Sequence, residues 1–357
     1  MRVLVATDAW RPQINGVVRT YERLADGAAD LGVELVFLTP AAFKTIPCPT
    51  YPEIRLAIPG YNYLIERIDL AAPDAVHIAT EGPIGWMVRR YCMRRAIPFT
   101  TAFHTRFPEY ISERFGVPVS WTYAIQRTFH NRGAGMMVAS RSLVDELDSR
   151  GFKHILPWTR GVDTDLFYPR DVRRFGAQPV SIYVGRVAVE KNIAAFLDAD
   201  IDGRKVVVGT GPLLDELKQR HPDVIFTGKL VGTELAEAYA SADVFVFPSL
   251  TDTFGIVLIE AMASGLPVAA YPVTGPVDNV ENGVSGILDK DLTKAATLAR
   301  TLDRQKVREH ALSFSWEAAA RLFISNIETA LFFRQGKRIP ARRKPSIIRR
   351  MRSVGEL

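Results

Sequence analysis

A glycine followed by two spaced cations is the first feature of this sequence that suits a chemical role. Gly185 and Arg186 end a strand-like apolar run at 180–184, and Lys191 stands just before a helix expected to begin at about Asn192. Glycine lets the backbone turn tightly, and a helix start offers amide N–H groups of partial positive charge. Together with the two cations, these groups suit a diphosphate. A solvated surface patch is the alternative, so a second feature must decide.

The second feature is a pair of carboxylates within residues 249–267. This segment joins the end of a predicted strand to an apolar helix, at the edge where doubly wound sheets bind ligands. Carboxylates suit sugars because they accept hydrogen bonds from neighbouring hydroxyls. Glu260 lies inside the apolar helical run, which predicts that it is buried against a partner. The residues expected to face phosphate or sugar here are Asp252, Thr253, Phe254, Gly255 and Glu260.

Gly16 and His104 are candidates of the same kind in the first half of the chain. Asn15 and Gly16 form a turn before a helix that starts near Val17, and His104 follows a strand-like run at 99–102. A helix start and the carboxyl end of a strand both face the ligand-binding edge of a doubly wound sheet. Taken alone, the Asn-Gly pair is an ordinary tight turn and a lone histidine is more often structural.

Short apolar runs alternate with helical patterns along most of the chain, which is typical of parallel, doubly wound α/β sheets. The pattern runs to about residue 102, restarts at 180 and continues to 270, so two α/β domains are expected. A length of 357 residues fits two such domains and a tail. The segment 163–179 contains prolines and no periodicity, which places the boundary near residue 170.

Taken together, these features resemble the family-4 glycosyltransferases of the GT-B fold. The matching segments are 12–17 (PQINGV), 73–85 (PDAVHIATEGPIG), 103–108 (FHTRFP), 160–167 (RGVDTDLF), 185–191 (GRVAVEK), 209–212 (GTGP) and 252–267. The resemblance implies two doubly wound, Rossmann-like parallel-sheet domains that face each other across a cleft. The implied divisions are an acceptor domain at 1–170, a nucleotide-sugar domain at 171–315, a helix at 316–335 packing back towards the first domain, and a basic tail at 336–357.

The same resemblance gives roles to the candidate residues. Arg186 and Lys191 would bind the donor diphosphate, while Asp252 and Glu260 would bind donor hydroxyls. Asp252 stands where the family more often has glutamate, which keeps the charge and shortens the reach. The remaining implied donor contacts are Gly16 and, near the nucleotide base, Val231. The implied catalytic residues are His104 and Asp252.

The resemblance also implies a retaining reaction that needs no metal ion. The acceptor would attack the donor on the face from which the diphosphate leaves, with a phosphate oxygen helping to remove the acceptor proton. No side-chain nucleophile is then required. No cofactor is expected, because the nucleotide sugar is a substrate.

Basic residues are concentrated at the end of the chain. Residues 337–357 hold eight Lys or Arg and one acid, whereas the first 336 residues hold 37 basic and 38 acidic residues, so the body lacks the charge of a nucleic-acid-binding protein. An anionic membrane would attract this tail, and also Arg89, Arg90 and Arg94 in a predicted helix at 83–95. The tail residues expected to contact lipid are Arg342, Arg343, Lys344, Arg349 and Arg350.

The sequence contains two cysteines and no apolar run near the roughly 20 residues that span a bilayer. We therefore expect a cytoplasmic enzyme, peripherally associated with the inner face of the cell membrane, that uses a UDP- or GDP-sugar and a lipid acceptor such as diacylglycerol or a phosphatidyl lipid. The first alternative is a GDP-mannose-dependent α-mannosyltransferase with a lipid-linked or polysaccharide acceptor. A nucleotide-sugar epimerase and a non-catalytic sugar-nucleotide-binding module also stay open.

Overall fold

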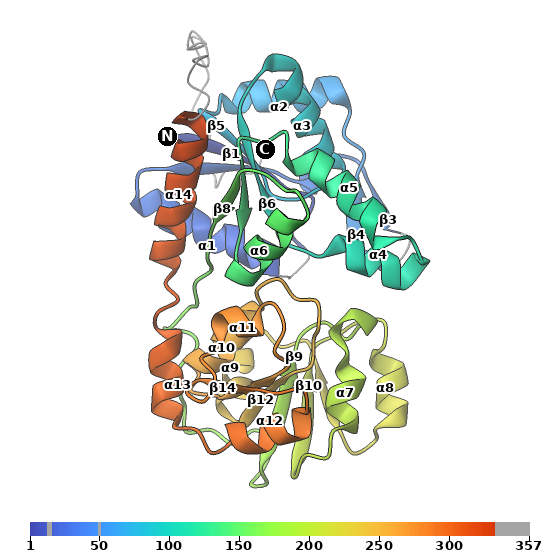
Figure 1. Ribbon diagram of the computed structural model, residues 1–357, viewed down its shortest axis with the longest axis vertical. Coiled ribbons are helices and arrows are strands. Elements are labelled where there is room, and N and C mark those ends of the chain that lie inside the picture. Colours follow the sequence, from blue (N-terminus) through green and yellow to red (C-terminus); the bar gives the residue numbers. More distant parts are fainter. Residues whose placement is uncertain (13–15, 49–50, 333–357) are drawn as a thin grey trace. The chain divides into compact units, whose positions relative to one another are not determined.

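The computed structural model describes residues 1–12, 16–48 and 51–332, with the side chains of 51–54, 110, 113 and 114 outside the description. The described chain forms two units, one of residues 1–139, 144–158 and 319–332, the other of 140–143 and 159–318. Each unit is built on its own parallel sheet of six strands (Figure 1). This confirms the prediction of two doubly wound α/β domains.

The first unit combines a parallel sheet with a separate hairpin. Its strands are β1 (Arg2–Ala6), β2 (Glu34–Leu38), β3 (Thr45–Cys48), β4 (Tyr51–Ala57), β5 (Ala75–Ile78), β6 (Phe99–Phe103), β7 (Gly135–Val138) and β8 (Ile155–Pro157). The helices along this part of the chain are α1 (Gly16–Asp30), α2 (Tyr61–Ala71), α3 (Pro83–Arg95), α4 (Phe107–Phe115), α5 (Val119–His130) and α6 (Arg141–Ser149). The sheet order is β2-β1-β5-β6-β7-β8, with all neighbours parallel. β3 and β4 pair antiparallel, which the sequence analysis did not predict.

Strand β1 shows why helices cover both faces of this sheet. Val3 and Val5 lie in the core that also contains residues of α1, whereas Leu4 and Ala6 lie in the core that contains residues of α2 and α3. All four side chains are fully buried. Successive side chains of a strand point to opposite faces, so a strand covered on both sides must be apolar throughout.

The last described helix, α14 (Trp316–Phe332), runs along the first unit (Figure 1). Phe323 and Ile327 of this helix are buried in the core that also holds Tyr21 of α1. Trp158 donates its indole N–H to the Ala319 carbonyl at 3.2 Å. Burial of a side chain such as Phe323 contributes about 2–3 kcal/mol, so this helix is an integral part of the core. The helix expected at 316–335, whose apolar residues recur every three to four positions, begins at Trp316 and is described as far as Phe332.

The second unit has the same architecture. Its strands are β9 (Val180–Val184), β10 (Arg204–Val208), β11 (Ile225–Gly228), β12 (Val244–Phe247), β13 (Val268–Ala270) and β14 (Gly286–Leu288). Its helices are α7 (Ile193–Asp198), α8 (Leu214–Arg220), α9 (Gly232–Ala240), α10 (Ile256–Ala263), α11 (Pro276–Asn279), α12 (Leu292–Ala299) and α13 (Arg304–Ala311), with a 3₁₀ turn at Val189–Lys191. The sheet order is β11-β10-β9-β12-β13-β14, again with all neighbours parallel.

Apart from residues 140–143, the second unit starts at residue 159, whereas the boundary was expected near 170. Val162 donates its backbone N–H to the Phe314 carbonyl at 3.1 Å, and the ring of Phe167 meets that of Tyr239 with centroids 5.8 Å apart. Prolines and charges mark where a chain is irregular. They do not show which core the irregular segment joins, and here Phe167 joins the second one.

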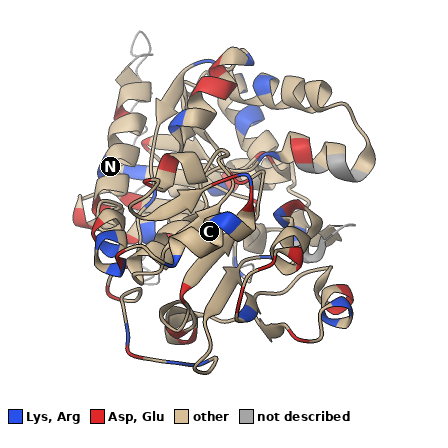
Figure 2. Cartoon of the chain, turned by 60° about the horizontal axis from the view of Figure 1, so that its bottom comes forward, with Lys and Arg blue, Asp and Glu red and all other residues tan. Residues whose placement is uncertain are grey.

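Charged residues of both signs are interspersed over the described chain (Figure 2), in line with the near-neutral balance of the first 336 residues. Among the described residues, no helix combines the length and the apolar character needed to cross a bilayer. The basic tail at 336–357 lies outside the described residues.

Candidate active site

The second sheet reverses its direction of winding between β9 and β12. The strand order places these two strands side by side, although a long stretch of chain separates them. The loop after β9 contains Arg186 and Lys191, and the loop after β12 contains Asp252. Doubly wound sheets bind nucleotides at such a reversal, outside the carboxyl ends of the strands.

Lys191 and Asp252 form an ion pair at this reversal. The Nζ atom of Lys191 lies 2.6 Å from Oδ1 of Asp252, and each side chain is 19% exposed. The second carboxylate oxygen, Oδ2, is buried and makes no hydrogen bond within the described part of the chain. A buried acceptor left without a donor costs about 1–3 kcal/mol. The structure therefore places Lys191, predicted to bind phosphate, beside Asp252, predicted to bind sugar. One oxygen of the Asp252 carboxylate is available to accept a further hydrogen bond.

Two further hydrogen bonds join the same two loops. Asn192 donates its Nδ2–H to the Pro248 carbonyl at 3.1 Å, and the Thr251 hydroxyl donates to the Glu190 carbonyl at 3.3 Å. Asn192 has a φ of 51°, a left-handed conformation that asparagine tolerates better than most residues. The helix that follows, α7, has only six residues. A bound diphosphate would therefore be attracted more by the two cations, and less by the helix start, than the sequence pattern suggested.

Arg186 follows Gly185 at the end of β9. The Tyr183 hydroxyl donates to the Arg186 carbonyl at 2.8 Å, and the arginine side chain is half-buried. A Cβ on Gly209 would lie 1.8 Å from the Gly185 carbonyl oxygen. The Gly-Thr-Gly-Pro segment after β10 can therefore approach the arginine loop only because Gly209 has no side chain.

The residues after Asp252 form a turn at the start of α10 that is held by contacts with other segments. Thr253 and Phe254 are buried, and Gly255 has a φ of 78° just before the helix begins. The buried side chain of Asn279 donates its Nδ2–H to the Phe254 carbonyl at 2.5 Å. The ring of Phe254 packs edge-on against Phe314. Phe254 can therefore meet a ligand through its backbone and not through its ring.

Glu260 and Val231 occupy contrasting positions. Glu260 is 3% exposed, and its Oε2 accepts a hydrogen bond from the Tyr239 hydroxyl at 3.1 Å, which confirms that it is buried against a partner. Val231 is exposed and directly precedes α9, after the edge strand β11. Their contacts with a donor stay predictions.

The first sheet reverses its direction between β1 and β5, and the buried Asp8 lies there. Its carboxylate accepts the N–H groups of Ile84 at 2.8 Å and Gly85 at 3.2 Å, at the start of α3, and the hydroxyl of Thr80 at 3.0 Å. Burial outweighs these bonds and raises the pKa of Asp8 to about 6. Gly16, the predicted backbone contact, is the first residue of α1 after the same strand.

The raised pKa of Asp8 predicts a specific dependence of stability on pH. The folded protein binds this proton more tightly than the unfolded chain, whose carboxyl has the ordinary value of 3.8. Stability from this group is therefore complete below that value and is lost as the pH rises through about 6. We expect the free energy of unfolding of Asp8→Asn, relative to the unchanged protein, to rise by about 2–3 kcal/mol between pH 4 and pH 7. Urea titrations of both proteins measure it, and a difference independent of pH would refute the argument.

His104 lies at one end of a chain of hydrogen-bonded side chains in the first unit. Its Nε2 is 3.0 Å from the Tyr21 hydroxyl, which is 2.7 Å from Nε2 of His77. The Nδ1 of His77 is 2.8 Å from the Thr100 hydroxyl. All four side chains are buried, and burial lowers the pKa of His77 to about 3, so that its ring is neutral at physiological pH.

The neutral ring of His77 limits how the protons can be arranged in this series of hydrogen bonds. A neutral imidazole has one N–H and one bare nitrogen, so the Tyr21 hydroxyl donates to one histidine and accepts from the other. When Tyr21 donates to Nε2 of His77, it accepts from His104, and Nδ1–H of His77 donates to Thr100. In the other arrangement all three hydrogen bonds run in the opposite direction.

The three arginines of α3 that were predicted to contact a membrane lie in two groups. Arg89 donates from Nε and Nη2 to two carbonyl groups near the end of α5, at 3.1 and 2.9 Å, so it holds two helices together. Arg90 and Arg94 are exposed, and both guanidinium groups lie over the ring of Tyr61, at 5.2 and 5.5 Å from its centroid. The tail residues Arg342, Arg343, Lys344, Arg349 and Arg350 lie outside the described residues.

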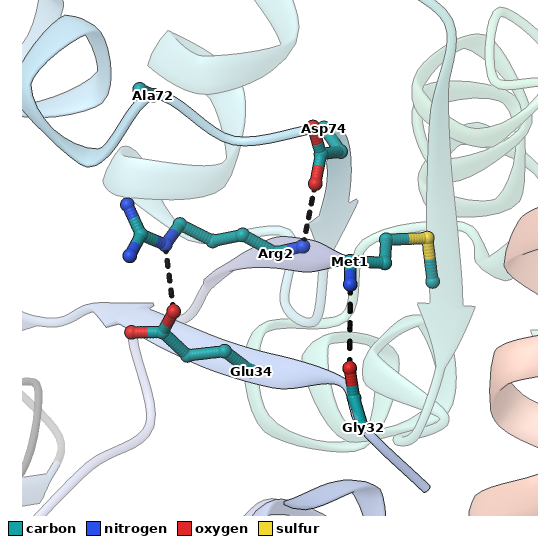
Figure 3. Close-up of a pocket in the computed structure, with 6 residues that line it drawn as sticks. All are labelled: Met1, Arg2, Gly32, Glu34, Ala72 and Asp74. Atoms are coloured by element: carbon teal, nitrogen blue, oxygen red, sulfur yellow. Dashed lines mark hydrogen bonds and ion pairs between the residues drawn. The ribbon is translucent and has the colours of Figure 1, made fainter.

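A pocket at the opposite end of the first sheet is lined by Met1, Arg2, Gly32, Glu34, Ala72 and Asp74 (Figure 3). There Nε of Arg2 lies 2.8 Å from the Glu34 carboxylate, and the Arg2 backbone N–H donates to Asp74 at 2.7 Å. This is the amino end of β1, whereas parallel sheets bind ligands at the carboxyl end. We assign the pocket no part in the chemistry.

The principal site residues that were not predicted are Asp8, Tyr21 and His77. Asp8 had a usable signal, because it is a carboxylate just past the carboxyl end of the first predicted strand. His77 is a polar residue inside an apolar strand run, which signals burial but not a partner. Tyr21 has the spacing of an ordinary core aromatic, and nothing in the sequence distinguishes it.

Comparison with known families matches each half of the chain. The family described as "Glycosyltransferase Family 4" matches residues 14–166. The family described as "Glycosyl transferases group 1" matches residues 178–304. The two matches fall on the two predicted domains and overlap every segment that carried the resemblance.

Individual relatives agree with this assignment. A GDP-mannose-dependent alpha-mannosyltransferase of Mycolicibacterium smegmatis is 30% identical over 93% of this chain and 98% of its own length. The sulfoquinovosyl transferase SQD2 of Arabidopsis thaliana is also 30% identical, over 83% of this chain, which spans only 64% of that protein. The alpha-monoglucosyldiacylglycerol synthase of Streptococcus pneumoniae is 24% identical over 88% of this chain and 81% of its own length.

The fold has a similar solved structure. Sucrose-phosphate synthase from Thermosynechococcus elongatus superposes with a TM-score of 0.75, over 93% of this chain and 99% of the other, at 22% identity. That likeness concerns the fold alone, and it agrees with two parallel-sheet units of the GT-B kind. The chain therefore belongs to glycosyltransferase family 4 and is a glycosyltransferase of the GT-B fold.

Proposed function

We propose that this enzyme transfers a hexosyl unit from a UDP- or GDP-sugar to a membrane lipid, such as diacylglycerol or a phosphatidyl lipid. The reaction retains the anomeric configuration and uses neither a metal ion nor another cofactor. The observation that carries the donor half of the proposal is the Lys191–Asp252 pair at the reversal of the second sheet. This pair places a cation that can bind the diphosphate directly beside a carboxylate that can bind the sugar.

The donor would bind through an exchange of partners at this pair. The diphosphate takes the place of Asp252 beside Lys191, with Arg186 as a second cation. Oδ2 of Asp252, which is buried and has no hydrogen bond within the described chain, accepts a hydrogen bond from a sugar hydroxyl. As the glycosidic bond breaks, negative charge grows on the diphosphate, and fixed cations stabilise it by several kcal/mol.

The first unit would supply the residue that orients the transferred sugar. His104 makes this contact, and Tyr21 and His77 hold its ring. The acceptor hydroxyl forms the new bond to the anomeric carbon on the face from which the diphosphate departs, and its proton passes to a phosphate oxygen. The nucleoside diphosphate leaves with the electron pair of the old bond. A reaction by this route requires no nucleophilic side chain.

A lipid acceptor is supported by one relative and by charge. The S. pneumoniae relative is named for diacylglycerol glucosylation. The tail of residues 337–357, with eight basic residues and one acid, suits the anionic inner face of a cell membrane. We therefore place the enzyme in the cytoplasm, bound peripherally to that face.

A GDP-mannose-dependent α-mannosyltransferase is the second candidate. The M. smegmatis relative bears this name and matches over almost its whole length. Its acceptor would be a lipid-linked sugar or a polysaccharide. The two candidates share the donor site described above and differ in the nucleotide base and in the acceptor.

Product analysis separates the candidates. Purified enzyme is incubated with UDP-glucose or GDP-mannose and with diacylglycerol in mixed micelles, phosphatidylinositol, or a mannan oligosaccharide. We expect a glycolipid whose anomeric configuration, measured by NMR, matches that of the donor, at a rate unchanged by EDTA. Transfer only to the oligosaccharide would favour the second candidate. An inverted product, or a rate abolished by EDTA, would overturn the proposed mechanism.

A further inference from the structure

One face of α5 presents large apolar side chains to solvent. Trp121 and Ile125 are 68% and 58% exposed, and their spacing of four residues puts them on the same side of the helix. Phe115, at the end of the neighbouring α4, is 62% exposed. We call these three side chains the apolar ridge. An exposed apolar cluster of this kind marks a surface that is covered by something else.

The opposite face of α5 is fixed, so the helix cannot turn to bury the ridge. Tyr123 donates to Glu109 at 2.7 Å, and Gln126 donates to Glu81 at 3.3 Å. His130 lies 3.0 Å from the same Glu81. These partners belong to other elements of the first unit. The outward position of Trp121 and Ile125 is therefore built into the fold.

The chain around the ridge is strongly basic. Residues 83–132, from the start of α3 to just past α5, hold eight arginines and two glutamates, whereas the first 336 residues are almost balanced. Arg90, Arg94, Arg127 and Arg132 are exposed. Exposed tryptophan, isoleucine and phenylalanine in a segment rich in exposed arginines have the composition of protein segments that lie in the interface of an anionic bilayer.

We propose that the apolar ridge inserts into the headgroup region of an anionic lipid bilayer, with Trp121 entering the interface and the arginines binding lipid phosphates. The inference rests on the proposed function, because an enzyme with a lipid acceptor must reach it at a membrane. It adds an apolar contact on α4 and α5 to the basic tail and the α3 arginines, which were expected to contact the membrane through their charge. A second copy of the chain is the competing occupant. Two such basic surfaces would repel each other, whereas anionic lipid complements them.

The fluorescence of Trp121 can report directly whether the ridge enters a bilayer. Of the five tryptophans, all of which the structure describes, it alone is exposed. On vesicles of phosphatidylcholine and phosphatidylglycerol, we expect a blue shift of its emission and quenching by brominated acyl chains. Trp121→Phe should keep vesicle binding and lose most of this change. Trp121→Ser with Ile125→Ser should lower the partition coefficient by roughly 100-fold, about tenfold for each side chain.

Matched variants separate the ridge from other causes. Leu298→Ser with Leu312→Ser removes two exposed leucines of the second unit and should leave vesicle binding unchanged. A chain ended after Gly336 should bind more weakly and still show the Trp121 shift. Vesicle binding without a Trp121 response, or equal binding by the double-serine ridge variant, would place the membrane contact elsewhere. Sedimentation that reveals self-association, lost in that variant and without any vesicle effect, would identify the ridge as a protein interface and overturn the inference.

The same experiments distinguish this inference from the proposed function. Glycosyl transfer to lipid in detergent micelles is measured in parallel. If transfer to micellar lipid proceeds while Trp121 never enters vesicles, the acceptor assignment stands and the ridge inference falls. If Trp121 enters vesicles while no lipid is glycosylated, the ridge inference stands and the acceptor assignment falls.

Discussion

Lys191→Ala is expected to lower kcat by about 10²- to 10³-fold, the usual cost of removing one fixed group that stabilises transition-state charge. Lys191 is the cation held at the reversal of the second sheet, 2.6 Å from Asp252. Without it, the departing diphosphate gains its negative charge with only Arg186 beside it. Steady-state rates with saturating donor measure the effect.

Lys294→Ala is the matched control for this substitution. Lys294 belongs to the same unit, and its Nζ lies 2.6 Å from Oδ2 of Asp289, the same separation as in the Lys191–Asp252 pair. That second pair is far more exposed and lies on the surface. We expect Lys294→Ala to keep the kcat of the unchanged enzyme. Equal, small losses in the two variants would show that Lys191 is only one more surface charge.

His104→Ala is expected to lower kcat by about 10²-fold, and Tyr21→Phe by about tenfold, because misplacing a sugar-orienting group by a fraction of an ångström already slows the reaction. Tyr21→Phe keeps the ring and removes only the hydroxyl that lies 3.0 Å from His104 Nε2. KM for the donor should change much less than kcat, since the proposed diphosphate contacts, Arg186 and Lys191, belong to the other unit. Single-turnover rates of both variants test this.

A double-mutant cycle shows whether Tyr21 acts through His104. If it does, Tyr21→Phe should cost almost nothing once His104 has been replaced by alanine, so the two effects will not add. Tyr91→Phe is the matched control, because Tyr91 is a buried tyrosine of the same unit whose hydroxyl donates to Asp69 at 2.9 Å. Full additivity would give Tyr21 a purely structural role.

The sequence was most informative where packing alone decides the structure. Buried strands such as β1 and β9 must be apolar on both faces, so their positions were readable. The helix α14 was readable from its apolar spacing. The hairpin of β3 and β4 was not, because its exposure is mixed and its partner cannot be known before the chain folds. The sequence also did not show that residues 159–170 belong to the second unit. That assignment depends on the packing of Phe167 against Tyr239, which is distant in the sequence.

The candidate site was predictable as a set of loops but not as a set of contacts. Strand ends and glycines pointed to Lys191 and Asp252 separately, because the loops after parallel strands lie at the ligand-binding edge. Their ion pair follows from the neighbouring position of β9 and β12, which is a property of strand order. The hydrogen bonds that link His104 to His77 both involve the hydroxyl of Tyr21, which lies on α1. Such contacts between distant segments have no local signal.

Titration calorimetry with UDP and GDP tests the central claim most directly, that the donor diphosphate binds at Lys191. At least one of the two nucleotides should bind the unchanged enzyme and Lys294→Ala with equal affinity. For Lys191→Ala, the loss of a charge-assisted hydrogen bond should raise the Kd by about 10- to 100-fold. A Lys191→Ala enzyme that binds the nucleotide as tightly as Lys294→Ala would contradict the account, and the diphosphate would have to lie elsewhere.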